Sequence, residues 1–254
     1  MKVRILGSGT SSGVPRIGND WGACDPAEPR NRRTRVSALV EHDGTRILID
    51  TGPDMRAQLL DADVGEVDAV LWTHDHADHC HGIDDLRQLF HNRGTPVRGF
   101  ARPATLESLK RRFDYAFAGR AGYRPTIVAA DLSDAMAIGP IDIRCTDQPH
   151  GSITSAGLRF DAGGKSVGYA TDFSAVTPDM HKLYQHVDVL IVDALRVAPH
   201  PTHPSLAEAI AFSRACGAGR TILIHMDNSM DYASLVAALP PGFEPGYDGM
   251  DIVP

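Results

Sequence analysis

The chain has 254 residues, of which 43% are hydrophobic, so it is long enough to bury a sizeable core. Its formal net charge of −7 excludes a general positive field that would hold long nucleic acid or an anionic membrane. The four cysteines are far apart and form no Cys-x-x-Cys pair, which excludes a disulfide framework and a thiolate zinc knuckle. No apolar run approaches the ~18 residues of a membrane span, and no signal-peptide segment is visible, so we expect a cytoplasmic protein without membrane association.

Short strands and helices alternate along the chain. Runs rich in β-branched residues predict strands at residues 2–6, 37–42, 46–50, 68–73, 141–145, 166–170, 187–194 and 220–226. Helical spacing of apolar residues predicts helices at residues 53–62, 82–90, 105–113, 177–187 and 204–217. Short turns between the early strands favour antiparallel hairpins, whereas helices separate most of the later strands. This α/β order fits a mixed sheet, or two sheets with helices outside, and no repeat or linker divides the single domain expected over 1–254.

The segment "THDHADH" follows an apolar strand and carries His74, His76, Asp78 and His79. Twelve histidines placed at random would rarely put four of them within eight residues, as happens from His74 onward. A loop after a rigid strand can hold side chains in place without burying its own backbone. Imidazole and carboxylate groups together suit zinc, and also manganese or iron, so the segment predicts part of a metal site.

Three further residues are candidate ligands because each interrupts or follows an apolar strand: His150, Asp172 and His225. A polar side chain buried at such a place needs a partner, and a cation is one possibility. Each residue alone could equally be satisfied by backbone groups. Together they favour a second set of metal ligands.

These motifs resemble a known signature. "THDHADH" is similar to the His-x-His-x-Asp-His motif of the metallo-β-lactamase-fold hydrolases, and "PHG", "ATD" and "LIH" follow in that family's usual order. The resemblance implies a four-layer αββα sandwich with two divalent ions, zinc or manganese. It implies one ion on His74, His76 and His150, the other on Asp78, His79 and His225, and Asp172 bridging both. It leaves the substrate open, because the family cleaves β-lactams, thioesters, lactones and phosphodiesters.

The charge of such a centre favours an anionic substrate. Two divalent ions, two ligand aspartates and a bridging hydroxide leave about +1, and two metals stabilise both oxygens of a phosphoryl displacement. We therefore expect a phosphodiesterase in which Asp78 contributes to catalysis as a ligand and His203 is the general acid. Ser205 and Glu208 form a capping-box pattern that would start a helix beside His203, whereas His200 has no such anchor.

Four other segments resemble a narrower branch of the family, the phosphoribosyl 1,2-cyclic phosphate phosphodiesterases associated with carbon-phosphorus lyase. They are "GSGTSSGVPRIG", "DPAEPRNRRTRVSALV", "THPSLAEAI" and "GFEPGYDGMDI". The resemblance gives His203 the branch's catalytic histidine role. That branch often binds a structural zinc through Cys-x-Cys-x-x-Cys and a later histidine. Here the corresponding residues are Asn19, Trp21, Cys24 and Asn228, so we predict no structural zinc.

The run "RNRRTR" and Ser205 are the candidate substrate contacts. One or two of Arg30, Arg32 and Arg33 could donate paired hydrogen bonds to a phosphate. A solvated face or internal ion pairs would explain such a run about as well. Residues 100–124 mix aromatic and basic side chains, which suits a nucleotide or short single strand. Core packing or a homodimer face is the favoured explanation of those aromatics.

Several functions remain open at this stage. The leading prediction is hydrolysis of a small cyclic or nucleotide-like phosphodiester, without a stable nucleic-acid complex. The alternatives are a ribonuclease Z-like RNA endonuclease and a thioester or lactone hydrolase of the same fold. A non-enzymatic nucleotide-binding module is a weaker alternative, because all seven expected ligands are present.

Overall fold

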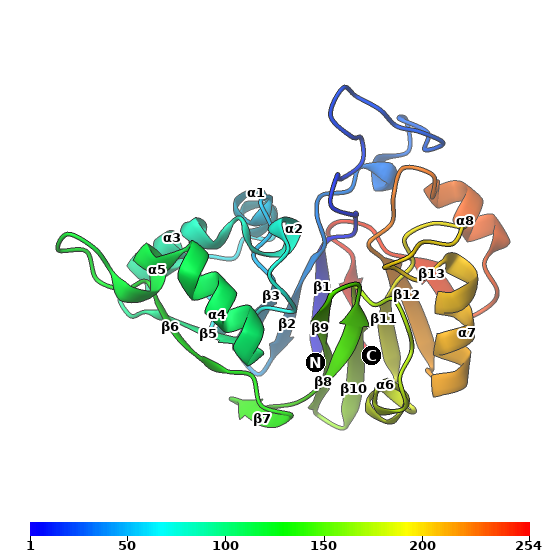
Figure 1. Ribbon diagram of the computed structural model, residues 1–254. Helices are drawn as coiled ribbons and strands as arrows, with labels where there is room; N and C mark the ends of the chain where they lie inside the picture. The colour runs from blue at the N-terminus through cyan, green and yellow to red at the C-terminus, as the bar shows by residue number, and fades with distance from the viewer.

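Two seven-stranded sheets lie face to face in the computed structural model, which describes all residues 1–254 (Figure 1). The first sheet has the order β14-β1-β2-β3-β4-β5-β6 and the second has the order β13-β12-β11-β10-β9-β8-β7. The strands of the first sheet are β14 (Asp251–Ile252), β1 (Lys2–Gly7), β2 (Ser37–His42), β3 (Thr45–Ile49), β4 (Ala69–Leu71), β5 (Val97–Ala101) and β6 (Ile127–Asp131). Those of the second sheet are β13 (Phe243–Pro245), β12 (Arg220–Ile224), β11 (Val189–Asp193), β10 (Lys165–Ala170), β9 (Ile153–Ala162), β8 (Ile141–His150) and β7 (Ala135–Ile138).

Helices cover the outer faces of both sheets (Figure 1). The first sheet carries α1 (Met55–Asp61), α2 (Ala77–Cys80), α3 (Leu86–Arg93), α4 (Pro103–Arg112) and α5 (Asp114–Ala118). The second sheet carries α6 (Pro178–Tyr184), α7 (Leu206–Cys216) and α8 (Tyr232–Ala238). Short 3-10 turns lie at η1 (Pro29–Asn31) and η2 (Ile83–Asp85). The predicted αββα sandwich is therefore confirmed. None of the helices has the length and apolar character that a bilayer crossing requires.

Three apolar clusters fill the three interfaces between these four layers. The largest has 27 buried residues from both sheets, including Ile5, Ile47, Leu158 and Ile191, and it is the core between the sheets. A second cluster lies under α1 to α5, and a third lies under α6 to α8. Strand β11 is buried along its whole length because sheet and helices cover both of its faces, which explains its unbroken apolar sequence.

Both antiparallel and parallel pairings occur, as the early hairpins and later crossovers predicted. Strands β2 and β3 form an antiparallel hairpin, and β3 to β6 then run parallel through helical crossovers. In the second sheet β8, β9 and β10 form an antiparallel meander, whereas β10 to β13 are parallel. The carboxyl ends of the parallel strands meet at one edge of the sandwich, the usual place for a site in such folds.

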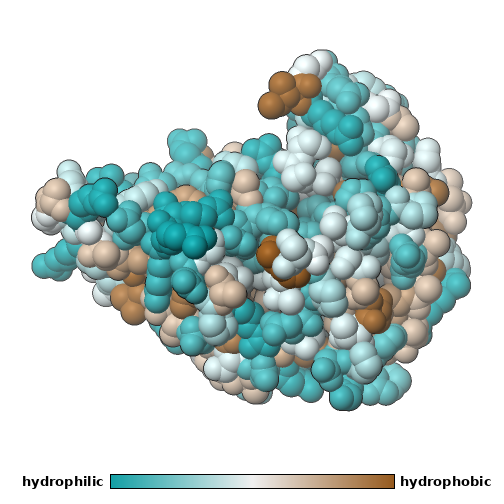
Figure 2. Space-filling model, in the orientation of Figure 1, coloured by the Kyte–Doolittle hydropathy of each residue, from teal (hydrophilic) through white to brown (hydrophobic).

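The surface seen in Figure 2 is largely hydrophilic, with hydrophobic side chains in small separate groups. This agrees with the net charge of −7 and with burial of the apolar residues in the three clusters. The long connection between β1 and β2, residues 8–36, rises above the strand ends (Figure 1). It therefore borders the edge of the sandwich at which the candidate ligands lie.

Candidate metal centre

The ends of four strands bring the candidate ligands together. His74 follows β4, His150 ends β8, Asp172 follows β10 and His225 follows β12. The remaining three candidates, His76, Asp78 and His79, lie in the connection after β4 and in the one-turn helix α2. The structure thus places all seven residues in one cluster at the same edge of the sandwich.

Asp172 lies at the centre of the cluster, and its two carboxylate oxygens face different histidines. Oδ2 lies 3.8 Å from Nε2 of His74 and 3.6 Å from Nε2 of His150. Oδ1 lies 3.3 Å from Nε2 of His79 and 3.5 Å from Nε2 of His225. One carboxylate therefore has a separate oxygen for each side of the cluster, which is the geometry of a bridging ligand.

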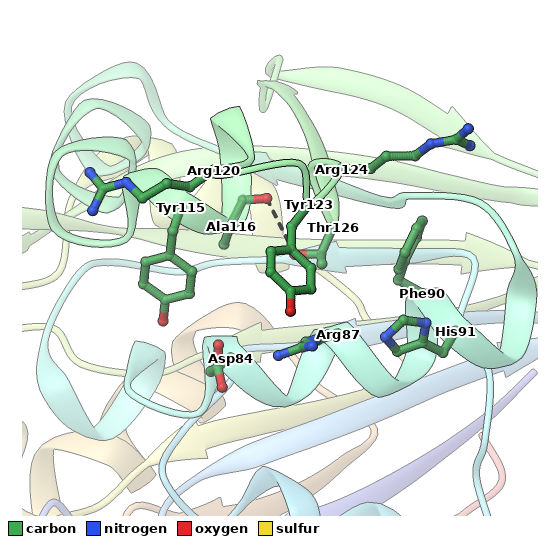
Figure 3. Close-up of a pocket in the computed structure, with 10 residues that line it drawn as sticks. All are labelled: Asp84, Arg87, Phe90, His91, Tyr115, Ala116, Arg120, Tyr123, Arg124 and Thr126. Atoms are coloured by element: carbon green, nitrogen blue, oxygen red, sulfur yellow. Dashed lines mark hydrogen bonds between the residues drawn. The ribbon is translucent and has the colours of Figure 1, made fainter.

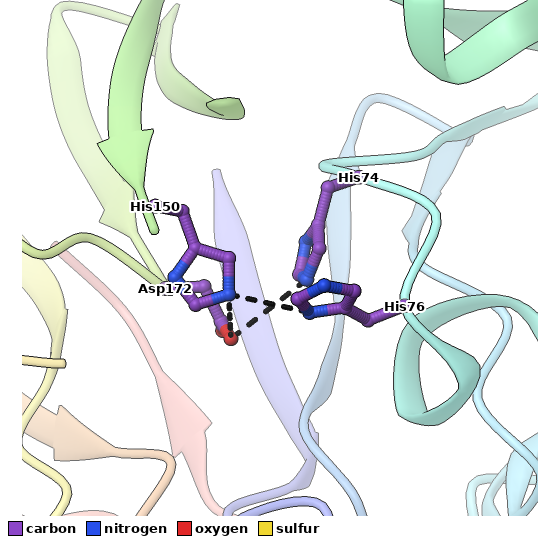
Figure 4. Close-up of side chains that lie close together, drawn as sticks. All are labelled: His74, His76, His150 and Asp172. Carbon is purple, nitrogen blue, oxygen red and sulfur yellow. Dashed lines mark hydrogen bonds and ion pairs between the residues drawn. The ribbon is translucent and has the colours of Figure 1, made fainter. Parts of the chain in front are cut away.

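Two groups of donors surround Asp172. In the first, drawn in Figure 4, His76 Nδ1 lies 3.2 Å from His150 Nε2, and His74 completes the set. In the second, Asp78 Oδ2 lies 3.4 Å from His79 Nε2 and 3.6 Å from His225 Nε2. The donor atoms of each group lie within 4.8 Å of one another. Nitrogen and carboxylate donors in such groups suit zinc or manganese.

Several ring nitrogens in this cluster are buried without a hydrogen-bond partner: Nε2 of His74, Nε2 of His79 and both ring nitrogens of His225. A buried polar atom that has neither water nor a protein partner is destabilising. Divalent ions held by the two donor groups would satisfy these Nε2 atoms. The residues therefore fit two ions, and the first donor group opens to solvent at His76, which is exposed.

Hydrogen bonds to the opposite ring nitrogens fix the orientation of the histidines. Asp50 Oδ2 lies 2.8 Å from His79 Nδ1, and the Thr73 hydroxyl lies 3.0 Å from His74 Nδ1. Asp50 also accepts a hydrogen bond of 2.7 Å from the Thr73 backbone N–H. The Thr202 carbonyl lies 3.0 Å from Nδ1 of His150. Each contact favours the tautomer that leaves Nε2 free for a metal.

The backbone is left-handed at three of these strand ends. Asp50, Asp172 and His225 have φ values of 63°, 51° and 59°. Residues other than glycine are uncommon in this region, and strained backbone of this kind gathers at functional sites. Each left-handed residue turns the chain sharply as its strand ends. Asp172 and His225 are candidate ligands, and Asp50 holds the ring of His79.

The two donor groups differ in their affinity for protons. Burial lowers the pKa of His74 well below its ordinary value and also lowers that of His150. Burial acts in the same direction on His225, but Asp172, Asp193 and Asp78 outweigh it and raise that pKa to about 9. Nearby carboxylates likewise raise the pKa of His79 well above its ordinary value. In the metal-free protein at pH 7, His79 and His225 are therefore positively charged, whereas His74 and His150 are neutral.

We expect metal binding to the second donor group to release protons at pH 7. An ion must displace the protons on His79 and His225, so its affinity should rise as the pH approaches 9 and fall as the pH drops. The group of His74 and His150 should change much less over the same range. Calorimetric metal titrations of the stripped protein, in buffers of different ionisation enthalpy, measure this release. Two binding events with equal pH dependence and no proton release would contradict the expectation.

Two side chains of helix α4, Ser108 and Arg112, hold the loop that runs from Asp75 to His81. We call this pair the clamp. The Ser108 hydroxyl donates to Asp75 Oδ2 at 2.5 Å, and Arg112 donates to the backbone carbonyl of Asp75. The second terminal nitrogen of Arg112 lies 2.7 Å from Nε2 of His81. The clamp therefore binds both ends of the loop that carries His76, and it gives Asp75 and His81 structural roles.

Replacement Arg112→Ala should weaken metal binding without removing a ligand. Loss of the donors to Asp75 and His81 frees the loop. Direct partners of ligands are worth about 10- to 100-fold in metal affinity, and Arg112 acts one contact further away, so we expect a loss of at most about tenfold. Competition with a chromogenic chelator measures the change. Arg111→Ala, an exposed neighbour on the same helix, is the matched control and should leave the affinity as it is. An unchanged affinity in Arg112→Ala would show that the loop needs no clamp.

His203 lies beside the cluster and is held by a buried carboxylate. Its Nδ1 lies 2.8 Å from Oδ2 of Asp193, which is fully buried at the end of β11. Its ring stacks on that of His225 with centroids 4.8 Å apart and lies 5.0 Å from that of His150. Helix α7 begins three residues later, and the predicted capping box between Ser205 and Glu208 is confirmed. His200 has no carboxylate partner, and its ring lies 5.2 Å from that of His203.

The predicted substrate contacts need correction at two positions. Arg33 is only 2% exposed and donates to the backbone carbonyls of Asp227 and Met230 at 3.1 and 2.6 Å. The structure therefore does not support a substrate role for Arg33, which instead fastens the 8–36 connection to the loop after β12. Ser205 is buried, and its hydroxyl is occupied by the capping box, so a substrate contact there is not supported either.

The other two arginines predicted as substrate contacts, Arg30 and Arg32, lie at the surface. Arg30 pairs with Glu28 at 2.7 Å and lies over the Tyr232 ring. Arg32 is exposed and lies over the Trp21 ring with 5.1 Å to its centroid. Internal partners thus explain Arg30, and Arg32 is the member of the run that stays exposed without a carboxylate partner.

The residues at the positions of the branch's structural-zinc motif have protein partners. The Asn228 side chain donates to Asp20 at 3.0 Å, and the Trp21 indole donates to Asn19 at 3.2 Å. Cys24 is buried, and its sulfur lies 3.8 Å from the Arg33 guanidinium. One cysteine among amides and an indole does not suit a tetrahedral zinc, so these residues do not fit the branch's structural metal.

Comparison with known proteins decides the family. A model of the beta-lactamase superfamily domain matches residues 45–226, which is most of the chain and includes all seven candidate ligands. The chain belongs to the metallo-β-lactamase superfamily. The superfamily resemblance predicted from the motifs is therefore confirmed, and the buried His and Asp groups make this chain a hydrolase of that fold with a metal site.

Several known proteins are similar to this chain over its whole length. A solved structure described as a new diphosphatase from the PhnP family has a TM-score of 0.90 and 33% identity, covering 99% of this chain and 96% of that one. Zn(2+)-bound PqqB from Methylobacterium extorquens has a TM-score of 0.80 and 22% identity, covering all of both chains. A Porphyromonas gingivalis protein named octanoyltransferase is 31% identical over 261 residues, which is 100% of this chain. This chain spans 51% of that protein's length.

Two functional residues lay outside the sequence predictions. Asp50 and Asp193, which orient His79 and His203, were not among the candidates. Each ends or follows an apolar strand, at "RILID" and "VLIVD". The same signal selected Asp172, so applying it to every strand would have found both aspartates.

Proposed function

We propose that this protein is a metal-dependent phosphodiesterase acting on a small cyclic or nucleotide-like phosphodiester. The observation that carries the proposal is the Asp193–His203 pair beside the two donor groups. Hydrolysis of a phosphodiester requires a proton for the departing alkoxide, and a carboxylate-anchored histidine is a suitable source. The similarity to a PhnP-family diphosphatase supports phosphorus chemistry over thioester or lactone hydrolysis.

In this proposal the seven candidate ligands would hold two divalent ions, and the zinc-bound PqqB of the same fold favours zinc. Bound ions would supply an activated water and neutralise the charge of the substrate oxygens. Asp78 would be a ligand of the ion at the second donor group, and its contacts with His79 and His225 keep both rings in place. The negative charge of Asp172 would offset part of the positive charge at both donor groups.

Asp193 and His203 act on the leaving group. Because Asp193 accepts from Nδ1 of His203, the ring can present a proton on Nε2 while the buried carboxylate stabilises its positive charge. The departing oxygen takes this proton as the ester bond breaks. Ring contacts with His150 and His225 limit the rotation of His203, so the donor stays in place beside the donor groups.

A diphosphate ester is the second candidate substrate, because the structure with a TM-score of 0.90 is described as a diphosphatase. The chemistry at phosphorus is similar, but the leaving group is a phosphate rather than an alkoxide. A phosphate is a much weaker base, so its departure depends less on a proton from His203. The two substrates therefore predict different sensitivities to loss of that histidine.

A metal-by-substrate screen tests the proposal. Stripped protein is reloaded with zinc, manganese or iron and incubated with bis(p-nitrophenyl) phosphate, ribose and nucleoside cyclic phosphates, and dinucleoside diphosphates. Thioester and lactone substrates are included as the competing classes. We expect turnover of at least one phosphodiester with zinc or manganese. Hydrolysis of thioesters or lactones alone would contradict the proposal, and diphosphate hydrolysis alone would establish the second candidate.

A further inference from the structure

A pocket of about 160 Å³ lies between helix α3, helix α5 and the turn that precedes β6 (Figure 3). Its walls include Tyr115, Tyr123 and Arg87, and Asp84 and Arg124 lie at its margin. None of its lining residues belongs to the seven candidate ligands or to the Asp193–His203 pair. It is therefore separate from the site of the proposed function.

The two tyrosines are exposed, whereas the sequence favoured core packing or a homodimer face for the aromatics of this segment. Phe113 and Phe117 do pack against the apolar cluster under α1 to α5. Tyr123 is 70% exposed and Tyr115 is 40% exposed, and neither ring is paired with another aromatic ring. Figure 3 shows both rings turned into the pocket. Core packing thus explains the phenylalanines and leaves the two tyrosine rings exposed at the pocket.

The charges around the two rings are suited to a ligand with a polar edge and a negative group. The Arg87 guanidinium lies over the Tyr123 ring, 5.3 Å from its centroid, and has no carboxylate within 4.0 Å. Arg124 is exposed and likewise has no ion-pair partner, whereas Arg120 is paired with Asp114 at 2.7 Å. Asp84 contributes an exposed carboxylate that can accept from amino groups.

We propose that this pocket binds the base of a nucleoside phosphate. Ligand sites for whole drug-sized molecules are typically ~300–1,000 Å³, so a pocket of about 160 Å³ has room for one ring system. The base stacks on Tyr123 and Tyr115, which bind any base through its π-face. Asp84 favours bases that carry an amino group, and Arg87 and Arg124 attract the phosphate, which stays outside the pocket.

Titration of metal-stripped protein with GMP, AMP, UMP, guanosine, ribose 5-phosphate and inorganic phosphate, followed by calorimetry in the presence of a chelator, tests this proposal. Stripping the metals separates the pocket from the candidate metal centre, so the result does not depend on the proposed function. We expect saturable binding of the nucleotides, tightest for GMP and AMP, weaker for guanosine, and absent for ribose 5-phosphate and phosphate.

Variants assign the binding to the pocket. Tyr123→Ala should weaken nucleotide binding about tenfold, the amount expected for one lost stacking partner, and Tyr123→Phe should retain it. Arg124→Ala should weaken nucleotides more than guanosine, whereas Arg214→Ala, an arginine on α7 outside the pocket, is the matched control. Absence of nucleotide binding to the wild type, equal binding of ribose 5-phosphate, or unchanged affinity in Tyr123→Ala would each overturn the proposal.

Discussion

Asp172→Asn should reduce the metal content from two ions per chain to less than one and abolish most hydrolysis. Asp172 has one oxygen facing each donor group, so no other residue can replace it on both sides. Asparagine removes the negative charge and leaves only one oxygen donor. Since bound metals supply several kcal/mol of transition-state stabilisation, we expect turnover to fall by about 10³-fold or more.

Asparagine is the informative substitution because it preserves shape and tolerates the left-handed backbone at this position. The variant should therefore fold, and its melting temperature should resemble that of the metal-stripped wild type. Elemental analysis after dialysis measures the ions, and a thermal scan with and without added zinc measures their contribution to stability. Two retained ions in Asp172→Asn would show that the carboxylate does not bridge.

His203→Ala should retain both metal ions and lose about 10²- to 10⁴-fold in turnover of an alkyl phosphodiester, the usual contribution of a general acid. The loss should be far smaller for an ester with a p-nitrophenol leaving group, because that group departs without a proton. Asp193→Asn should give an intermediate loss, since its amide can no longer stabilise a positive His203 ring. These comparisons separate proton donation from a general disturbance of the site.

His200→Ala is the matched control for His203→Ala. The two histidines are three positions apart and their rings lie 5.2 Å from each other, but only His203 has a carboxylate partner. We expect His200→Ala to retain most activity. Loss of metal in His203→Ala would show that His203 is a ligand. Equal losses of turnover for alkyl and p-nitrophenyl esters would show that His203 is not the proton donor.

Most of the strands and helices and the seven candidate ligands could be predicted because their signals are local, whereas the αββα sandwich was implied by the family resemblance. Four of the ligands lie within six residues, and the others follow apolar strands, so each appears as a polar interruption of a regular pattern. The capping box at Ser205 is also a short-range signal. Strands such as β5 and β9 were harder to predict, because "VRGFA" and "ITSAGLRFDA" contain glycine and their pairing partners determine the strand.

The roles of charged residues depended on contacts that are distant in sequence. Arg33 belongs to the charged run "RNRRTR", whose sequence suggests an exposed segment. The carbonyl groups to which it donates lie 194 and 197 positions later. Arg112 reaches Asp75 from a helix 37 positions away. The aromatic ring of Tyr123 is typical of a core position, but the residue lies in a turn that leaves it exposed. In each case the partner that decides the role is set by tertiary structure, which no local pattern reports.

At the left-handed strand ends, selection for activity and selection for stability favour different residues. Glycine adopts positive φ without strain, so glycine at positions 50, 172 and 225 would relieve the backbone strain while deleting the two carboxylates and the imidazole on which the site depends. A descendant released from catalysis should therefore drift toward glycine or asparagine at these three places. Retention of Asp, Asp and His there would mark a lineage that still depends on the reaction.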